Sequence, residues 1–427
     1  MKRLLCTLAS LLLLASTLHA QDISGDWQGA AGAGKERQRI VLHIEKAASG
    51  GWKATLYAID IQQDGVPVTL TQHGAALTVS YPKDKLSYKA TLSPDGKSIA
   101  GTLDWDGTAQ LTLVHPTREA AWPYGPHCAC KASFVSVEKD VRLEVLDWGG
   151  TGRPLILLAG LGNTAHDFED FAHKLIGRYH VYGITRRGYG KSSVPTTEAS
   201  YRADRLGDDV LAVIEALHLR QRPVLVGHSI AGEELSSVGS RHPEKVAALI
   251  YLDAAYQYAF YSPTNGNADL DVLEVRRELG DLILKDGLDD KKIAELLQQL
   301  PELEKKLQQQ QQKVIGLPKA PHQAAAAFRP SDAILLGQQK YTKIPCAILA
   351  IYADPHDLGP MKKYTAAQIT AETKFMNDHT TNLSRAFETG NPSAKVVRIP
   401  NADHFVFESN EAEVLREMDA FLATLPD

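Results

Sequence analysis

Short runs in which apolar and polar residues alternate fill the chain between residues 22 and 115. Alternation with a period of two is typical of β-strands that bury one face, and helical periodicity is missing here. Asp-Gly pairs, which favour hairpin turns, separate several runs at 64–65, 95–96 and 106–107. We therefore predict a small antiparallel β domain, a barrel or a sandwich. Its predicted strands are 38–44, 52–59, 76–81, 88–92, 98–103 and 110–114.

The pattern changes after a stretch at 116–126 that contains several Pro and Gly residues. Continuous apolar runs follow a first hairpin, and such runs are typical of strands buried on both faces. Helical patterns at 208–219 and 231–240 lie between them. The alternation predicts an α/β fold with a mostly parallel sheet covered on both faces. The predicted strands are 134–137, 141–146, 155–159, 180–185, 223–226, 248–252, 347–352 and 395–399.

The first residues of the chain have the pattern of a secretory signal peptide. Lys2 and Arg3 precede an apolar stretch, and Ala20 offers a small residue at the expected cleavage point. We predict a cleaved signal, a secreted or periplasmic protein and no stable membrane anchor, because no later stretch is apolar enough to span a bilayer. The predicted organisation is a signal peptide at 1–20, a β domain at 21–118, a linker at 119–131 and an α/β domain at 132–427.

Charge and cysteine content exclude other classes of protein. The formal net charge is −5, with 44% hydrophobic and 23% charged residues and no basic stripe, so neither nucleic-acid binding nor disorder is expected. Cys128 and Cys130, with His127 beside them, lack a fourth ligand for a zinc site, so no metal is predicted. The sequence carries no sign of the oligomeric state.

One motif points to nucleophilic catalysis. Gly227-His228-Ser229-Ile230-Ala231 follows a predicted buried strand and opens a predicted helix. This arrangement matches the nucleophile elbow G-x-S-x-G, with Ala231 in place of the last Gly. Small residues are needed two positions before and after the serine, because the strand and the helix pass close together there. The turn would present the Ser229 hydroxyl at the carboxyl edge of the sheet.

From about residue 130 onward the chain resembles the α/β-hydrolase family. Besides the elbow, the resemblance rests on Leu158-Ala159-Gly160-Leu161-Gly162 after the third strand, Arg187-Gly188-Tyr189-Gly190-Lys191-Ser192 after the next strand, and Asn401-Ala402-Asp403-His404-Phe405 near the end. It covers roughly two-thirds of the chain. The helical, charged segment 255–342 then stands where relatives insert a cap over the pocket. In the first domain, Gly25-Asp26-Trp27 resembles the opening of lipocalin-like barrels, with no ligand implied.

The resemblance implies a catalytic triad. Ser229 would be the nucleophile and His404 its base. In the family the acid usually follows the seventh strand, and Asp357 fits that place better than Asp354. Asp253, after the sixth strand, is the remaining alternative, because some relatives carry their acid there.

The resemblance also implies an oxyanion hole and a pocket. The oxyanion donors would be the backbone N–H groups of Leu161 and Ile230. Gly160, which lets the loop approach the substrate, and His228 within the elbow are candidate pocket residues. Tyr256 and Tyr258 would either line the pocket or pack between cap and core.

We therefore predict a serine hydrolase that cleaves a carboxylic ester of a small-molecule substrate through an acyl-enzyme, with no cofactor. Amide, thioester or carbon–carbon bond hydrolysis on the same fold remains an alternative, because fold and triad do not choose among them. A non-catalytic binding protein that retains the pocket is the other alternative.

Overall fold

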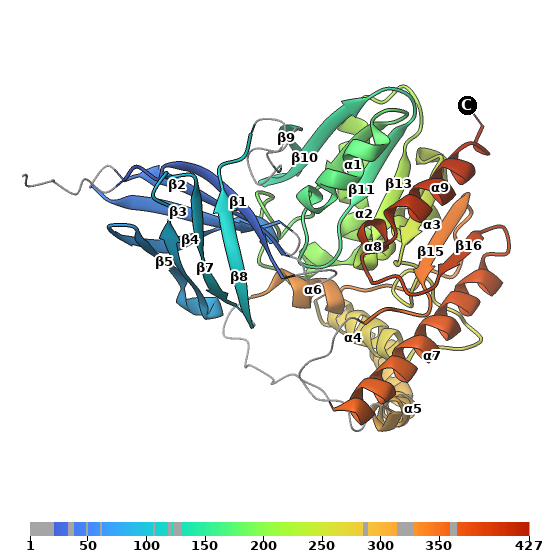
Figure 1. Ribbon diagram of the computed structural model, residues 1–427. Helices are drawn as coiled ribbons and strands as arrows, with labels where there is room; N and C mark the ends of the chain where they lie inside the picture. The colour runs from blue at the N-terminus through green and yellow to red at the C-terminus, as the bar shows by residue number, and fades with distance from the viewer. Residues whose placement is uncertain are drawn as a thin grey trace, which may run out of the picture. The chain divides into compact units, whose positions relative to one another are not determined.

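The computed structural model describes residues 21–32, 38–47, 50–59, 62–105, 107–117, 122, 130–284, 289–313, 328–358 and 365–426. The chain divides into two compact units, Met1–Tyr124 and Gly125–Asp427 (Figure 1). The division lies within the predicted linker 119–131. The predicted signal peptide 1–20 and most of that linker lie outside the described residues.

The first unit is a closed barrel of strands β1 to β8, in which each strand pairs antiparallel with the next. The barrel closes where Gln28 of β1 pairs with Val114 of β8. The strands are β1 (Gly25–Ala31), β2 (Gln38–Lys46), β3 (Trp52–Ala58), β4 (Gln62–His73), β5 (Ala76–Tyr81), β6 (Leu86–Leu92), β7 (Ser98–Asp104) and β8 (Thr108–Val114).

Side chains fill the interior of this barrel. The buried indole of Trp27 donates a hydrogen bond to the Ile23 carbonyl at 2.9 Å, and the buried Tyr88 hydroxyl lies 2.9 Å from the Ile99 carbonyl. Both polar tips are therefore satisfied inside an apolar core. A cavity among Leu56, Val66 and neighbouring side chains measures only about 10 Å³, which is room for little more than a water molecule.

Two barrel strands escaped prediction, and one predicted turn is wrong. The sequence pattern did not predict β1 or β4, and the Asp64-Gly65 pair predicted as a hairpin turn lies within β4. Glycine is needed at position 65 for packing and not for a turn, because a Cβ at this position would lie 2.5 Å from the ring of Tyr57 on β3. The missing side chain lets that ring cross the neighbouring strand.

The second unit contains an eight-stranded sheet in the order β16-β15-β14-β13-β11-β12-β10-β9. Strand β10 pairs antiparallel with β9 and β12, and the remaining pairs are parallel. The predicted α/β class, with an antiparallel β domain before it, is therefore confirmed. The strands are β9 (Lys131–Glu138), β10 (Val141–Gly150), β11 (Pro154–Leu158), β12 (His180–Ile184), β13 (Val224–His228), β14 (Ala248–Leu252), β15 (Ile348–Ala353) and β16 (Lys395–Ile399).

Helices cover both faces of this sheet. One core cluster joins it to α1, α8 and α9 through side chains such as Phe171, Phe407 and Met418. The other joins it to α2 and α3 through Val213 and Leu235. The helices are α1 (Glu169–Leu175), α2 (Ala203–Ala216), α3 (Gly232–Arg241), α8 (Val406–Ser409) and α9 (Glu411–Leu422).

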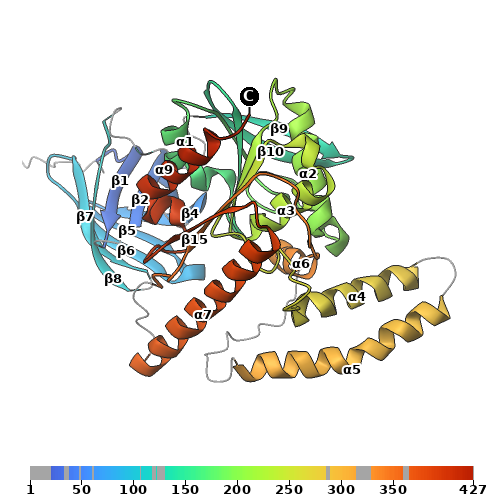
Figure 2. The ribbon, with the colours of Figure 1, turned by 90° about the vertical axis from the view of Figure 1, so that its right-hand side faces the viewer.

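The segment predicted as a cap contains α4 (Ala268–Leu284), α5 (Asp290–Lys313) and α6 (Pro330–Leu336). Figure 2 shows α4 and α5 as a long antiparallel pair, which packs through Val275, Leu296 and Leu303. The long helix α7 (Ala366–Gly390), between β15 and β16, was not predicted, because few of its side chains are buried apolar residues. Within the described part of the chain, no helix is both long and apolar enough to cross a membrane.

Candidate active site

Ser229 lies in a sharp turn between β13 and α3, as the elbow motif predicts. Its φ is +53°, a left-handed value that is costly for a residue with a side chain. A Cβ on Gly227 would lie 3.2 Å from that of Ala231, and one on Gly232 would lie 2.0 Å from the Ala254 carbonyl oxygen. The small residues therefore let strand and helix pass close enough to form the turn. The Ser229 side chain remains partly exposed.

The structure brings Ser229 and His404 into contact. His404 lies in the loop between β16 and α8, and its Nε2 is 2.8 Å from the Ser229 hydroxyl oxygen. Its Nδ1 is 2.7 Å from Oδ2 of Asp253, which directly follows β14. A carboxylate can only accept, so Nδ1 carries the proton and Nε2 is free to accept the Ser229 proton. The three side chains have the connectivity of a Ser-His-Asp triad.

The carboxylate that contacts His404 is that of Asp253, whereas the sequence favoured Asp357 for this place. The backbone N–H of Asp357 donates to the Ala402 carbonyl at 2.8 Å, whereas the carboxylate at His404 Nδ1 is that of Asp253. Asp354, the other candidate after β15, hydrogen-bonds Thr381 on α7. Strands β14 and β15 are neighbours that end at the same edge of the sheet, so both can bring an acid near His404. In this structure, the aspartate that follows β14 is the one that contacts His404.

Four hydrogen bonds reach the Asp253 carboxylate. Oδ1 accepts from the Tyr256 hydroxyl at 2.6 Å and from the Ala353 backbone N–H at 3.0 Å, and Oδ2 accepts from His404 and from His356 Nε2 at 2.9 Å. The side chain is fully buried. Burial opposes ionisation, but the hydrogen bonds from His356 and His404 hold the pKa of Asp253 well below its ordinary value. Asp253 is therefore ionised, which is the state that the acid of a Ser-His-Asp triad needs.

The loop predicted to form the oxyanion hole passes close to Ser229. A Cβ on Gly160 would lie 3.3 Å from the Ser229 Cβ and 3.0 Å from His228 Nδ1, so the missing side chain permits this approach. Leu161 and Ile230 belong to one apolar cluster beside the nucleophile. The loop and the turn that follows β13 are therefore side by side, where the two proposed N–H donors are needed.

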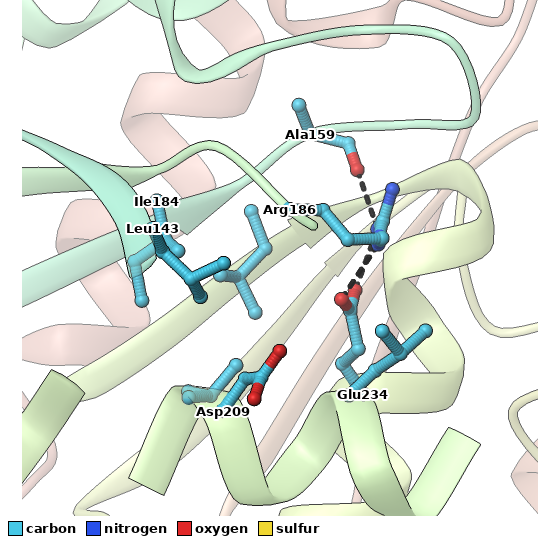
Figure 3. A pocket seen from close by; sticks show the side chains of 9 residues that line it. Leu143, Ala159, Ile184, Arg186, Asp209 and Glu234 are labelled. Carbon is cyan, nitrogen blue, oxygen red and sulfur yellow. Dashed lines mark hydrogen bonds and ion pairs between the residues drawn. The ribbon is translucent and has the colours of Figure 1, made fainter. Parts of the chain in front are cut away.

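Buried Arg186 fixes this loop from behind, a role the sequence did not predict. Its guanidinium donates to the Ala159 carbonyl at 2.8 Å and pairs with both carboxylate oxygens of Glu234 on α3 (Figure 3). It also donates to the Gly160 carbonyl at 3.2 Å. In a trans peptide the C=O and the next N–H point in opposite directions, so the Leu161 N–H points away from Arg186. The cavity beside Arg186 measures about 10 Å³, too small for a substrate.

The other predicted pocket residues have separate roles. His228 is buried, and its Nε2 donates to the backbone carbonyl of His404 at 2.9 Å, which holds the loop of the base. Burial, together with nearby His404, lowers the pKa of His228 to about 3, so the ring is neutral. Tyr256 donates to Asp253 and supports the acid. Tyr258 packs against an apolar cluster that contains Ile230 and Ile334 of α6.

Glu233, in the first turn of α3, is fully buried, and neither of its carboxylate oxygens has a hydrogen-bond partner among the described residues. Burial raises the pKa of Glu233 well above its ordinary value, and the neighbouring charge of Glu234 adds to the effect. The folded protein therefore keeps this acid protonated at pH values where the unfolded chain releases its proton.

Glu233→Gln is therefore expected to stabilise the protein at pH 8 but not at pH 4. A raised pKa in the folded state favours folding fully only below the unfolded pKa of about 4.3, and stability declines as pH rises. Between the unfolded pKa and the raised folded pKa, the gain in unfolding free energy from the neutral amide should grow by up to about 1.4 kcal/mol per pH unit. Urea unfolding at several pH values measures it, with exposed Glu302→Gln as control. If the difference in unfolding free energy between the Glu233→Gln variant and the wild type does not change with pH, the pKa of Glu233 is not raised.

Asp253, His356 and His404 also form the one cluster of His, Cys, Asp and Glu side chains among the described residues that has metal-binding spacing, with ligand atoms within 4.8 Å of one another. Each imidazole already directs an N–H at the carboxylate, and the other nitrogen of His404 faces Ser229. Hydrogen bonding therefore accounts for the cluster without an ion. Of the cysteines weighed earlier, Cys130 is disulfide-bonded and Cys128 lies outside the described residues.

Comparison with known proteins points to one family. The model of the "Alpha/beta hydrolase family" matches residues 155–417, more than half of the chain. The 2-(acetamidomethylene)succinate hydrolase of Mesorhizobium japonicum is 26% identical over 137 residues, which are 32% of this chain and 46% of that protein. Lipase 3 of Moraxella sp. is 32% identical over 105 residues, 25% of this chain and 33% of the lipase.

The chain thus spans less than half of the length of these two relatives. Among solved structures, a bromoperoxidase from Bacillus anthracis aligns with 69% of this chain and 100% of its own, at 19% identity and a TM-score of 0.43. The site described above lies within the matched region: Ser229, Asp253 and His404 all fall between residues 155 and 417.

Proposed function

The chain belongs to the alpha/beta hydrolase family, and from this premise we propose that it is an exported serine hydrolase that cleaves carboxylic esters. The observation that carries the proposal is the pair of short contacts made by His404. Its Nε2 lies 2.8 Å from Ser229 and its Nδ1 lies 2.7 Å from buried Asp253. These are the contacts that activate a serine, which is a weak nucleophile without a base.

The reaction proceeds in two halves. His404 takes the Ser229 proton as the hydroxyl oxygen attacks the ester carbonyl, and Asp253 stabilises the imidazolium that forms. The N–H groups of Leu161 and Ile230 bind the oxyanion, and each is worth on the order of 3 kcal/mol in the transition state. His404 then protonates the departing alcohol. In the second half it activates a water molecule, which hydrolyses the acyl-enzyme and frees Ser229.

Two features support an ester as the substrate. Ile230, which directly follows Ser229, belongs to an apolar cluster against which Leu161 and Tyr258 pack, and apolar surroundings suit an acyl or alcohol group without charge. One relative is named a lipase. Another is a hydrolase of an acetamido compound, so amides belong in the same substrate panel, together with thioesters and carbon–carbon substrates.

Export is the second part of the proposal. It rests on Lys2, Arg3, the apolar stretch that follows and Ala20. N-terminal sequencing of protein recovered from a periplasmic or culture fraction tests it. A mature chain that begins near residue 21 supports export, and an intact leader on cytoplasmic protein contradicts it.

Labelling of the purified protein with a fluorophosphonate probe tests the catalytic proposal. We expect modification of Ser229, located by mass spectrometry, and turnover of short or long p-nitrophenyl esters. Heat-denatured protein is the control for unspecific labelling. If folded protein is neither labelled nor active on any member of the panel, the site is a binding pocket rather than a catalytic one.

A further inference from the structure

Two histidines share one oxygen of the buried acid. Oδ2 of Asp253 accepts from His404 Nδ1 at 2.7 Å and from His356 Nε2 at 2.9 Å. His404 is the base of the proposed triad, whereas the observed hydrogen bonds of His356 do not include Ser229. The mechanism above therefore gives His356 no task, although its side chain is buried at the centre of the site.

His356 is fixed from several directions. It lies in the loop after β15 and forms an isolated parallel bridge with Ala402, two residues before His404. Its backbone N–H donates to the Asn377 side chain of α7 at 3.2 Å, and its Nδ1 lies 3.3 Å from the Thr380 hydroxyl. Such a ring has little freedom to rotate, so its Nε2–H stays directed at Asp253.

We propose that His356 is a positioning residue that holds Oδ2 of Asp253 in the orientation His404 needs. This inference rests on the triad proposed above. Tyr256 and the Ala353 N–H fix Oδ1, and His356 fixes Oδ2 while leaving its second lone pair for His404 Nδ1. The carboxylate is therefore held at both oxygens before the base engages it.

The tautomer of His356 follows from its partners. The carboxylate only accepts, so Nε2 must carry a proton, and in the neutral ring Nδ1 then accepts from Thr380. An apolar residue at 356 would leave Oδ2 with one donor fewer in a fully buried place. The carboxylate could then turn away from His404, and misplacement of a catalytic group slows the chemical step more than substrate binding.

The test compares variants that keep or remove the donor. Gln places its amide nitrogen near the position of His Nε2, whereas Asn is too short to reach Asp253 and Leu has no donor. We expect His356→Leu and His356→Asn to lower kcat about tenfold or more, with KM nearly unchanged, and His356→Gln to recover most of the loss. Circular dichroism and melting temperature establish which variants fold, and His379→Gln and His379→Leu on α7 are the matched controls.

Each outcome decides the proposal. Folded Leu or Asn variants with wild-type kcat, or a Gln variant no more active than Asn, overturn it. If the Leu variant does not fold, the Gln and Asn pair, which have the same amide group, carries the comparison. Failure of the triad itself is recognised separately, because wild-type Ser229 would then resist the fluorophosphonate probe. If Ser229 of the wild type is labelled but substitutions at residue 356 leave kcat unchanged, only the proposal for His356 is wrong.

Discussion

Asp253→Asn is expected to lower kcat about 10⁴-fold while the fold is retained. The amide is neutral, so it no longer stabilises the imidazolium of His404. It also presents an N–H₂ or a carbonyl to Nδ1, and the first of these forces the histidine into the tautomer that cannot accept the Ser229 proton. Initial rates of ester hydrolysis under saturating substrate measure the effect, with protein concentration taken from folded material.

Asp357→Asn is the matched control, with the same chemical change at the residue that the sequence favoured. Because Asp253 fills the acid position at His404, we expect kcat of this variant to stay within about threefold of wild type, as for a substitution outside the machinery. The reverse result, a large loss at 357 and a small one at 253, would mean that the working enzyme uses the acid after β15.

The environment of Asp253 also sets its pH behaviour. A carboxylate with a depressed pKa contributes stability above its unfolded pKa of about 3.9, and this contribution is lost only as pH falls through the lower folded value. Asp253 therefore stays ionised through the range in which ordinary carboxylates titrate. If activity falls on mild acidification, the group that gains a proton is therefore one other than Asp253.

The places of Ser229 and His404 in the fold were predictable because local sequence determines their geometry. A buried strand followed by Gly-x-Ser-x-Ala and a helix leaves the chain few ways to turn, and the observed φ of Ser229 is the result. His404 follows the last strand and precedes a helix, which places it at the same edge of the sheet. Contact between the two follows from topology.

Which aspartate contacts His404 could not be predicted in this way. Asp253 and Asp357 follow adjacent parallel strands, so topology brings both to the same edge. The choice between them depends on which backbone turns its side chain toward His404, and Asp253 does so with a φ of +46°. Tyr256 and His356, which hold Asp253 there, carry no motif that distinguishes them from core residues.

Strand and helix prediction failed for related reasons. Strand β4 contains Gly65 and Pro67, residue types that usually interrupt strands. Strand β1 contains two glycines, Gly25 and Gly29. Helix α7 presents mostly polar side chains, so apolar periodicity is weak, although Asn377 and Thr380 of this helix contact His356. Elements that serve polar contacts at a site leave little hydrophobic pattern to detect.

Ser229→Ala and His404→Ala are each expected to lower kcat about 10⁶-fold, and the double variant no further. The two residues act on one proton transfer, so removal of either abolishes the same step. A residual rate about 10³-fold above the uncatalysed reaction should survive in all three variants, because the oxyanion loop held by Arg186 remains. Ester hydrolysis measured over hours checks this, with half-buried His242→Ala as control. Losses that multiply in the double variant would contradict the shared step, and Ser229 and His404 would then contribute to the rate independently.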